Sequence, residues 1–364
     1  TVSDCSAPSG APGRVREVIL AAGAGDTVVF SCSGTITLTD TLVISKDLTL
    51  DGAGQSVTIS GGDDVRVFFV NHKLTTFNLQ NLTVANGFAN SNGGGGVRNL
   101  GILNVTNVTF SDNAAEGNAG GGIVNSGELT VTNSVFTSNS TTSAGGGIYN
   151  NGKLTVTNSA FSGNHGVNGG GIANWYPGTA MVTNSVFSGN GADGGGGGVF
   201  TWSATTTLTN NAFSGNTAAY GGGVYAWNGA TVHITNSTFS GNSASTGGGI
   251  YGVSTITVTN STLSGNSATE GGGAIEASVT VRNTIIANSV SSRNCLINTN
   301  SALTDGGGNL QFGGTIADSC GATIPTADPV LGALADNGGP TQTMALGAGS
   351  AALEAANYAT CMAA

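Results

Sequence analysis

A repeat of 24 to 26 residues fills the middle of this chain and limits the folds that it can adopt. Each copy has an asparagine, a phenylalanine three residues later, a second asparagine three residues after that, and then a glycine triplet followed by an apolar residue. A fixed period of this length predicts a solenoid in which every copy forms one coil. The first asparagines are Asn107, Asn133, Asn158, Asn184, Asn210, Asn236 and Asn260; the phenylalanines are Phe110, Phe136, Phe161, Phe187, Phe213 and Phe239, with Leu263 in the last copy; the second asparagines are Asn113, Asn139, Asn164, Asn190, Asn216, Asn242 and Asn266.

Alternating apolar and polar residues predict three short strands in each coil. Leu129 and Val131 alternate with threonines, so the two apolar side chains point inward. The segments 135–136 and 147–149 supply the other two strands. Three strands in a coil of about 25 residues indicate an all-β, single-stranded parallel β-helix with coils about 4.8 Å apart. The phenylalanine column then fills the interior, and the asparagines pair amide to amide from coil to coil.

Composition excludes several classes of function. Only 8% of the residues are charged, and 19 acids against 9 bases give a formal net charge of −10. No cluster of lysines and arginines is visible in the sequence, which disfavours binding to nucleic acid. The longest apolar run, Val18 to Ala22, is too short to cross a bilayer, so we expect no transmembrane segment.

All five cysteines lie outside the repeat. None has the spacing of a zinc site, so we predict two disulfides, Cys5–Cys32 and Cys295–Cys320, one at each end of the solenoid, with Cys361 left over. Cysteines confined to the ends of a chain rich in Ser, Thr and Asn favour a secreted, extracellular protein. The absence of a signal peptide at Thr1 is expected if it has already been removed.

The two ends of the chain depart from the repeat. Val15, Val18, Ile19 and Ala22 form an apolar face with helical spacing, which predicts a short capping helix within 13–24 over the first coil. We expect an N-terminal cap with irregular first coils in residues 1–50, the parallel β-helix in 51–290, and the last coils with a C-terminal cap segment in 291–364.

Several motifs resemble known families. The combination of Gly-Gly-Gly-Ile and Phe-x-x-Asn resembles the repeat of the chlamydial polymorphic outer-membrane proteins, which implies a surface-exposed, right-handed β-helix. The segments 14–19 and 25–30 resemble the part of secreted bacterial β-helix proteins that follows the CSLREA motif, although those letters are not intact here. The tail, in 336–346 and 349–353, resembles the ends of choice-of-anchor proteins. Together the resemblances imply the fold and export.

The repeat also predicts which side chains share a surface. The residue after each inward Ile or Val points outward, and so does the residue two positions later. The first outward column is Val124, Tyr149, Ala173, Phe200, Tyr225, Tyr251 and Ile275, and the second is Ser126, Asn151, Trp175, Trp202, Trp227, Val253 and Ala277. All three tryptophans therefore fall on consecutive coils.

We name the six residues Trp175, Trp202, Trp227, Phe200, Tyr225 and Tyr251 the aromatic strip. A contiguous exposed strip is typical of a binding surface, and flat rings suit the apolar faces of sugars. Three interpretations remain open at this point. The strip binds a glycan, it contacts another copy or partner, or it is covered by a loop such as 176–178 or by the preceding segments.

The acids do not form an evident catalytic pair. Glycoside hydrolysis needs two carboxyl groups about 5 to 9.5 Å apart. Asp193 and Glu270 share a turn position but lie three coils apart, or roughly 14 Å. Glu128 and Lys153 occupy one column in adjacent coils, where a surface ion pair accounts for them.

The densest group of charged residues lies in an irregular early coil and consists of Asp63, Asp64, Arg66, His72 and Lys73. It is the best candidate for an enzymatic site, although a solvated loop explains it better. The three histidines fall in separate coils and offer no metal cluster. We therefore predict no catalytic residue, no metal and no cofactor.

The expected function is an extracellular structural or adhesive rod without catalysis, which associates with itself or contacts a glycan through the aromatic strip. The alternative is a polysaccharide lyase or glycoside hydrolase on the same scaffold. A third possibility is ice binding, because pairs such as Thr155 and Thr157 resemble the threonine ranks of ice-binding β-solenoids. Asn104, Met181, His233 and Arg282 interrupt that rank.

Overall fold

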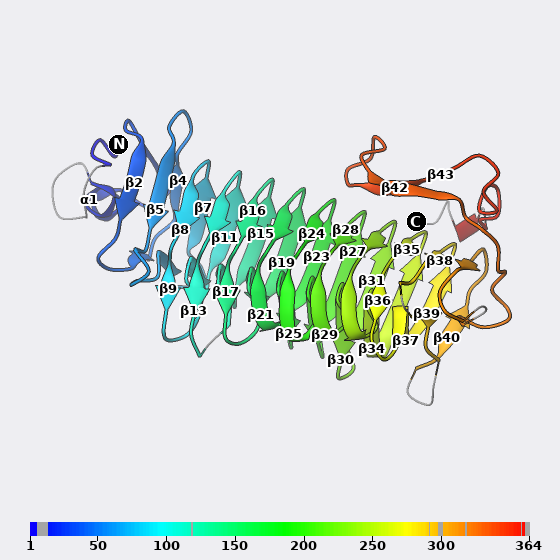
Figure 1. Cartoon of the computed structure of the whole chain (residues 1–364). Coiled ribbons are helices and arrows are strands. Elements are labelled where there is room, and N and C mark those ends of the chain that lie inside the picture. The colour runs from blue at the N-terminus through cyan, green and yellow to red at the C-terminus, as the bar shows by residue number, and fades with distance from the viewer. Residues whose placement is uncertain are drawn as a thin grey trace.

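The computed structural model describes residues 1–5, 14–117, 119–290, 292–297, 301–316, 319–357 and 359–360. In them the chain winds into a rod of stacked coils, with the strands of successive coils side by side from the N-terminal end to the C-terminal end (Figure 1). Every strand pairing between coils is parallel, as the alternating pattern predicted; one antiparallel hairpin lies outside the rod. The expected all-β parallel β-helix is confirmed.

Three parallel sheets run along the rod in the described residues. The long sheet contains β1 (Asp26–Val29), β3 (Leu42–Ile44), β4 (Leu48–Asp51), β6 (Phe68–Val70), β7 (Thr76–Gln80), β10 (Val97–Asn99), β11 (Ile102–Thr106), β14 (Ile123–Asn125), β15 (Glu128–Thr132), β18 (Ile148–Asn150), β19 (Lys153–Thr157), β22 (Ile172–Trp175), β23 (Thr179–Thr183), β26 (Val199–Trp202), β27 (Thr205–Thr209), β30 (Val224–Trp227), β31 (Thr231–Thr235), β34 (Ile250–Thr259), β37 (Gly272–Arg282), β39 (Arg293–Cys295) and β40 (Leu303–Asp305).

The other two sheets are made of shorter strands. The Phe sheet contains β2 (Gly34–Thr37), β5 (Val57–Ser60), β8 (Thr83–Ala85), β12 (Thr109–Ser111), β16 (Val135–Thr137), β20 (Ala160–Ser162), β24 (Val186–Ser188), β28 (Ala212–Ser214), β32 (Thr238–Ser240), β35 (Thr262–Ser264), β38 (Ile285–Ala287) and β41 (Leu310–Phe312). The short sheet contains β9 (Phe88–Ala89), β13 (Ala114–Ala115), β17 (Ser140–Thr141), β21 (His165–Asn168), β25 (Gly191–Gly195), β29 (Thr217–Tyr220), β33 (Ser243–Thr246) and β36 (Ser267–Ala268).

The core is a narrow column of like residues in register. In the Phe sheet, the rings of Phe136 and Phe161 stack with centroids 4.8 Å apart and planes 7° apart, and the same stacking extends from Phe110 to Phe239. These rings are fully buried. Because each ring repeats at the spacing of the coils, the phenylalanine column forms a continuous stack through the interior.

The second asparagines of the repeat form a buried amide ladder, as predicted. Asn164 Nδ2 donates to Asn190 Oδ1 at 2.9 Å and to the carbonyl of Phe136 at 2.9 Å, and its own Oδ1 accepts from Asn139 Nδ2 at 2.9 Å. The ladder continues from Asn113 to Asn266. A polar group in this interior is tolerated because every amide has partners.

Backbone conformation explains why the first position of the repeat is asparagine. They lie at the corners that follow the long-sheet strands, where Asn158 and its equivalents have φ near 50°. Asparagine tolerates this left-handed conformation better than other side chains with a Cβ. The sequence repeat therefore records one corner conformation and one buried ladder.

The N-terminal end of the rod carries the predicted helix, and each end carries one of the predicted disulfides. Helix α1 (Val15–Ala21) lies at the N-terminal end and buries Val15 and Ile19 (Figure 1). The two expected disulfides are present, Cys5–Cys32 with an S–S distance of 2.06 Å and Cys295–Cys320 with 1.99 Å. Cys361 lies outside the described residues.

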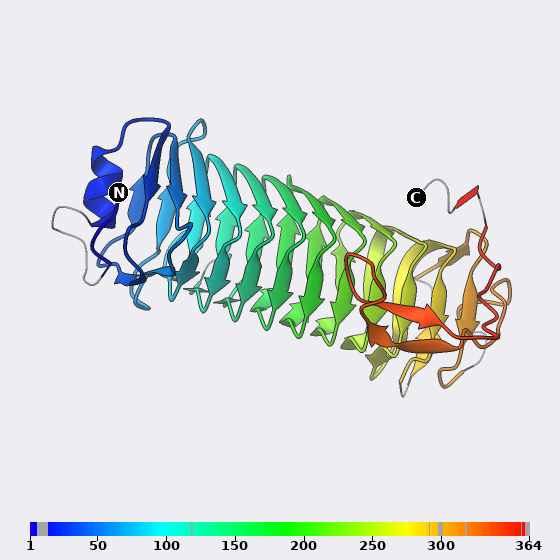
Figure 2. The same cartoon turned by 90° about the horizontal axis from the view of Figure 1, so that it is seen from above.

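The C-terminal tail extends farther along the rod than the sequence suggested. An antiparallel hairpin, β42 (Leu331–Ala335) and β43 (Thr343–Leu346), folds back beside the coils (Figures 1 and 2). Thr341 Oγ1 donates to the carbonyl of Asn210 at 3.1 Å. The sheets run from β1 to β41 across residues 50 and 290, so the domain limits expected there remain a prediction.

Candidate functional site

The three tryptophans lie in one row on the outward face of the long sheet. Trp175 pairs in register with Trp202, and Trp202 with Trp227. The rings of Trp175 and Trp202 are parallel, with centroids 4.8 Å apart and planes 3° apart. All three side chains are half-buried. The rod therefore presents a flat, partly exposed aromatic surface whose position is fixed by strand pairing.

A second row beside the tryptophans is more deeply placed. Phe200 is 1% exposed and Tyr225 is 9% exposed, whereas Tyr251 is half-buried. The Phe200 ring centroid lies 5.6 Å from that of Trp175 and 5.3 Å from that of Tyr225. The sequence placed Phe200 and Tyr225 on the outward face and left open whether preceding segments cover them; the structure buries them beneath neighbouring rings and the short sheet.

Two residues of the short sheet make this cover. A Cβ atom added at Gly195 would lie 1.9 Å from Tyr225 Cδ1, so the backbone of β25 rests on that ring. Tyr220, at the end of β29, has its ring centroid 5.9 Å from Tyr225 and 5.2 Å from Tyr251. The preceding segments thus cover part of the aromatic strip and leave the tryptophan row partly accessible.

The register of the last coil differs from the sequence expectation. Ile250 pairs with Ile275 and Tyr251 pairs with Glu276, so Ile275 points inward and Glu276 takes the outward position. The glycine triplet of this coil is followed by one additional small residue, Ala274, which shifts the strand by one position. A one-residue shift exchanges the two faces of a strand. The same shift places Ala277 opposite Gly252 rather than in the tryptophan row.

Glu276, in the column of Tyr225 and Tyr251, is a residue that sequence reasoning missed. Its side chain is buried, and a Cβ atom at Gly271 would lie 2.1 Å from its Oε2 atom. The additional residue between the triplet and Ile275 was the signal that could have located it. Glu270, the residue before Gly271, is exposed, in contrast to the buried Glu276.

The tyrosines around Glu276 hold their protons firmly. Burial raises the pKa of Tyr225, and Tyr251 and Tyr220 raise it further. Burial is also the largest cause that raises the pKa of Tyr251, and the Glu276 carboxylate and Tyr220 raise it by smaller amounts. Because an ordinary tyrosine already titrates near about 10, these phenols are neutral hydrogen-bond donors at physiological pH.

A surface hollow adjoins the other end of the tryptophan row. It has a volume of about 290 Å³ and is lined by Tyr149, Trp175 and Asn168 with small side chains of neighbouring coils. The Tyr149 ring centroid is 6.3 Å from that of Trp175. The hollow therefore touches both rows, since Trp175 belongs to the tryptophan row and Tyr149 to the neighbouring column that contains Glu276.

The column of Tyr149 extends toward the N-terminus through Val124, Arg98 and Phe69, and Arg66 lies beside it. Val124 pairs with Tyr149 and with Arg98, and Arg98 pairs with Phe69. The guanidinium carbon of Arg98 lies 5.1 Å from the Phe69 ring centroid, and that of Arg66 lies 6.0 Å from it. Sequence reasoning grouped Arg66 with nearby charges of its own loop and missed Arg98, because the two arginines are in different coils.

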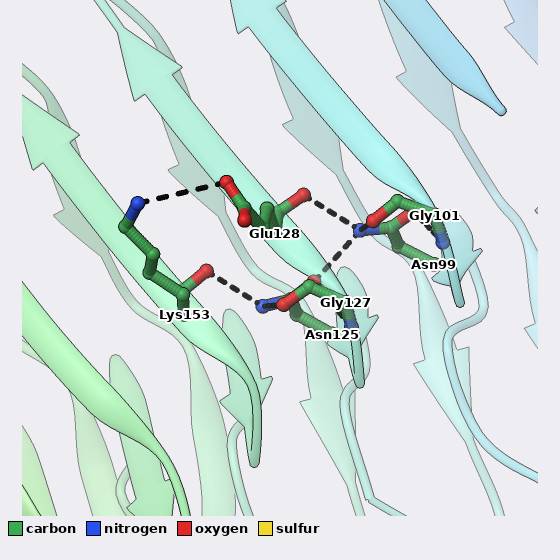
Figure 3. Close-up of polar contacts among 6 residues, drawn as sticks. All are labelled: Asn99, Gly101, Asn125, Gly127, Glu128 and Lys153. Atoms are coloured by element: carbon green, nitrogen blue, oxygen red, sulfur yellow. Dashed lines mark hydrogen bonds and ion pairs between the residues drawn. The ribbon is translucent and has the colours of Figure 1, made fainter. Parts of the chain in front are cut away.

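Two further pairs of charged residues lie on the surface of the described coils. Lys153 Nζ lies 3.6 Å from Glu128 Oε2, as expected from their column. Near this pair, the buried Asn99 Nδ2 donates to Asn125 Oδ1 (Figure 3). His165 Nε2 lies 3.3 Å from Asp193 Oδ1, and both side chains are exposed.

No group of three or more His, Cys, Asp or Glu side chains in the described ranges is placed to hold a metal ion. No helix in that part of the chain has the length and apolar character needed to span a bilayer.

Comparison with known proteins supports the fold. Residues 123–290 match a family model described as the right-handed β-helix region, which agrees with the expected handedness. No curated protein matches the chain. Among solved structures, a PL6 alginate lyase in complex with a trisaccharide has 11% identity and a TM-score of 0.44 over 96% of this chain and 91% of that one. An alginate lyase with the ligand G6 has 11% identity and a TM-score of 0.41 over 96% and 91%.

A mutant of a PL6-family alginate lyase is similar at 11% identity and a TM-score of 0.30, over 98% of this chain and 58% of that one. At these values the likeness concerns the coiled architecture and transfers no active-site residue. The expected function, a structural or adhesive rod without catalysis, is nevertheless corrected by this finding. These three solved structures are alginate lyases, so the non-catalytic rod is not carried forward.

Proposed function

We propose that the protein is a carbohydrate-active enzyme that cleaves a polysaccharide lying along the aromatic strip. The observation that carries this proposal is the parallel pair of half-buried rings, Trp175 and Trp202, beside the column that contains Tyr251 and Glu276. Sugar rings have apolar faces that stack on flat aromatic surfaces, and an exposed apolar strip is typical of a binding site. Strand register fixes the rings before a ligand arrives, which lowers the entropy cost of binding.

Length and direction also fit a polymer. Tyr149 and Glu276 are separated by five coil steps in the pairing of β18 through β37, or roughly 24 Å along the rod. A linear chain lying parallel to the rod axis would contact the hollow, the tryptophan row and the tyrosines in succession. A small sugar would use only part of this surface.

The chemistry is assigned to Tyr251, with Glu276 as a positioning residue. Tyr251 is half-buried at the end of the strip, and its raised pKa keeps the phenol protonated. A protonated phenol within hydrogen-bond reach of a glycosidic oxygen donates its proton to that oxygen as the C–O bond breaks. Water adds to the anomeric carbon and its second proton returns to the phenolate. Such acid catalysis contributes about 10²- to 10⁴-fold in rate. The buried Glu276 carboxylate behind it favours the protonated phenol.

The test is a survey of purified polysaccharides for cleavage. New reducing ends without an unsaturated sugar identify hydrolysis, and an ultraviolet-absorbing unsaturated end identifies a lyase. Tyr251→Phe should reduce the rate at least 100-fold while leaving binding in place, and Trp202→Ala should weaken binding. Tyr176→Ala, which removes a ring that is 66% exposed next to Trp175 but outside the strip, is the matched control.

Two results would contradict the proposal. Either every polysaccharide remains intact and unbound, or cleavage is unchanged in both the Tyr251 and Trp202 variants. Thermal melting of each variant separates loss of chemistry from loss of folding.

We also infer that the protein is exported. The disulfides Cys5–Cys32 and Cys295–Cys320 support this, since such bonds persist in oxidising compartments. The resemblance of the repeat and tail to surface-exposed and choice-of-anchor β-helix proteins points the same way. Fractionation of the native source, with peptide mapping before reduction, tests it; a reduced protein inside the cell would refute it.

A further inference from the structure

Arg98 occupies the same outward column as the aromatic strip, beyond the hollow. It is separated from Tyr149 by Val124 alone, so two coil steps, or about 10 Å, divide them along the rod. Its side chain is half-buried, and its guanidinium lies 5.1 Å from the centre of the Phe69 ring. Stacking on an aromatic ring orients the guanidinium and leaves its N–H edge available for hydrogen bonds.

Arg66 supports this position but is itself occupied. Its Nε and Nη2 atoms donate to the backbone carbonyls of Ser91, Gly93 and Gly94 at distances of 2.7 to 3.1 Å. These bonds fix the loop 91–94 next to Arg98. Arg66 therefore contributes a fixed positive charge, and Arg98 is the member of the pair that can meet a ligand.

The two cations lie close together in a partly dehydrated place. Burial, and to a smaller extent the neighbouring Arg98 charge, lower the pKa of Arg66 to about 10. Among the described residues, the ion pairs within 4 Å are Arg14–Asp4, Lys153–Glu128 and His165–Asp193, none of which involves either arginine. Two like charges with no carboxylate within 4 Å repel each other, and a bound anion would relieve that repulsion.

We propose that Arg98, supported by Arg66 and Phe69, is a subsite for an anionic substituent of the polysaccharide, either a carboxylate or a sulfate group. This inference rests on the proposed function and names the substrate class of the same surface. A guanidinium binds such oxoanions through two parallel N–H···O bonds. A chain that stacks on Trp175 would reach Arg98 about three coil steps, or roughly 14 Å, away.

The experiment measures retention of the full-length protein in gels that contain one polysaccharide each. The panel holds neutral glycans, polyuronates with their methyl esters, and sulfated glycans with their desulfated forms. Esterification and desulfation remove the charge and keep the sugar, so each pair isolates the anion. The carboxylate and sulfate arms identify which group the subsite accepts.

We expect tighter retention by one charged form than by its neutral partner, and a decrease of that difference as salt rises. Arg98→Gln should weaken binding of the charged form about 10- to 100-fold, the effect of losing a charge-assisted hydrogen bond, and leave the neutral form unchanged. Arg98→Lys, which keeps the charge but not the fork, should lose part of the preference. Lys73→Gln is the control, because it removes an exposed cation of a nearby coil.

Three results would overturn the inference. Equal retention of charged and neutral forms, or an unchanged preference in Arg98→Gln, refutes the subsite and leaves the proposed function in place. Retention by none of the glycans refutes the proposed function and the subsite together. Arg98→Lys and the melting temperature of each variant show whether a loss reflects the guanidinium or the fold.

Discussion

The interior asparagine column shows how single residues specify this solenoid. Asn164 is fully buried, and its amide donates to Asn190 and to the Phe136 carbonyl and accepts from Asn139. Each asparagine satisfies the next, so the column stabilises only the register in which all amides are aligned. The phenylalanine column imposes the same register through ring stacking.

Replacement of Asn164 by leucine should therefore be strongly destabilising. It leaves the Asn190 and Asn139 amides and the Phe136 carbonyl without their partner, at a cost on the order of 3 kcal/mol in the free energy of unfolding. Urea denaturation monitored by circular dichroism measures it. Asn104→Leu, on the outward face of β11, is the control and should change little. Equal stability of the two variants would refute the role of the ladder.

Tyrosine titration should make stability fall at alkaline pH. The folded state raises the pKa of Tyr225, so it retains the phenolic proton where the unfolded chain has lost it. That contribution is fully present below the ordinary tyrosine pKa of about 10 and is lost as pH rises through the folded value. We expect the melting temperature to fall above about pH 10.

Tyr225→Phe, which has no proton to release, should show a shallower decline, measured by thermal unfolding between neutral and alkaline pH. Tyr176→Phe at an exposed site serves as the control. Identical slopes in the wild type and Tyr225→Phe would disprove the contribution of this phenol.

At the scale of elements, the short sheet decides how much of the aromatic strip is open. The glycine triplets bring successive coils into close backbone contact; a Cβ atom at Gly146 would lie 2.5 Å from the carbonyl oxygen of Gly170. Strands of this sheet therefore approach the long sheet closely, and β25 and β29 reach the tyrosines. The cover over Tyr225 is a consequence of those small residues.

Gly195→Ala should displace that cover. The new Cβ atom would lie 1.9 Å from Tyr225 Cδ1, so the ring or the strand must move. We expect a loss of roughly 1–3 kcal/mol in stability and weaker polysaccharide binding. Tryptophan fluorescence and gel retention report the two effects. Gly339→Ala, where the nearest atom would be 3.6 Å away, is the control, and normal binding by Gly195→Ala would contradict the assigned contact.

At the scale of the whole molecule, the rod needs closed ends. A parallel solenoid exposes unpaired strand edges at its termini, which associate with other chains unless they are covered. Helix α1 covers the first coil with Val15 and Ile19, and the disulfide Cys5–Cys32 fastens the adjoining segment. The hairpin β42–β43 instead lies beside the rod (Figure 2).

Ile19→Lys should open the N-terminal end. Ile19 is 4% exposed. Loss of its buried side chain lowers the free energy of unfolding by about 2–5 kcal/mol, and a buried charge in its place adds to that loss. We expect association that increases with concentration, detected by light scattering coupled to size-exclusion chromatography. Leu20→Lys, one residue along the helix and 71% exposed, should remain like the wild type. If Ile19→Lys stays in the wild-type state, α1 is not a protective cap.

The sequence by itself determined the coil, its period, the phenylalanine and asparagine columns, the capping helix and both disulfides. These features repeat at one spacing or lie at the ends of the repeat, so a residue such as Phe161 has the same neighbours in each coil. The tryptophan row was predictable for the same reason. Strand pairing carries an identical position from coil to coil.

Tertiary structure alone decided the features that depend on contacts between different positions. The single additional residue Ala274 exchanged Ile275 and Glu276 between the inner and outer faces, because side chains alternate along a strand. Arg66 and Arg98 met only because adjacent coils are stacked. The burial of Tyr225 beneath Gly195 arises where two sheets of one coil meet, and a repeat pattern contains no record of that approach.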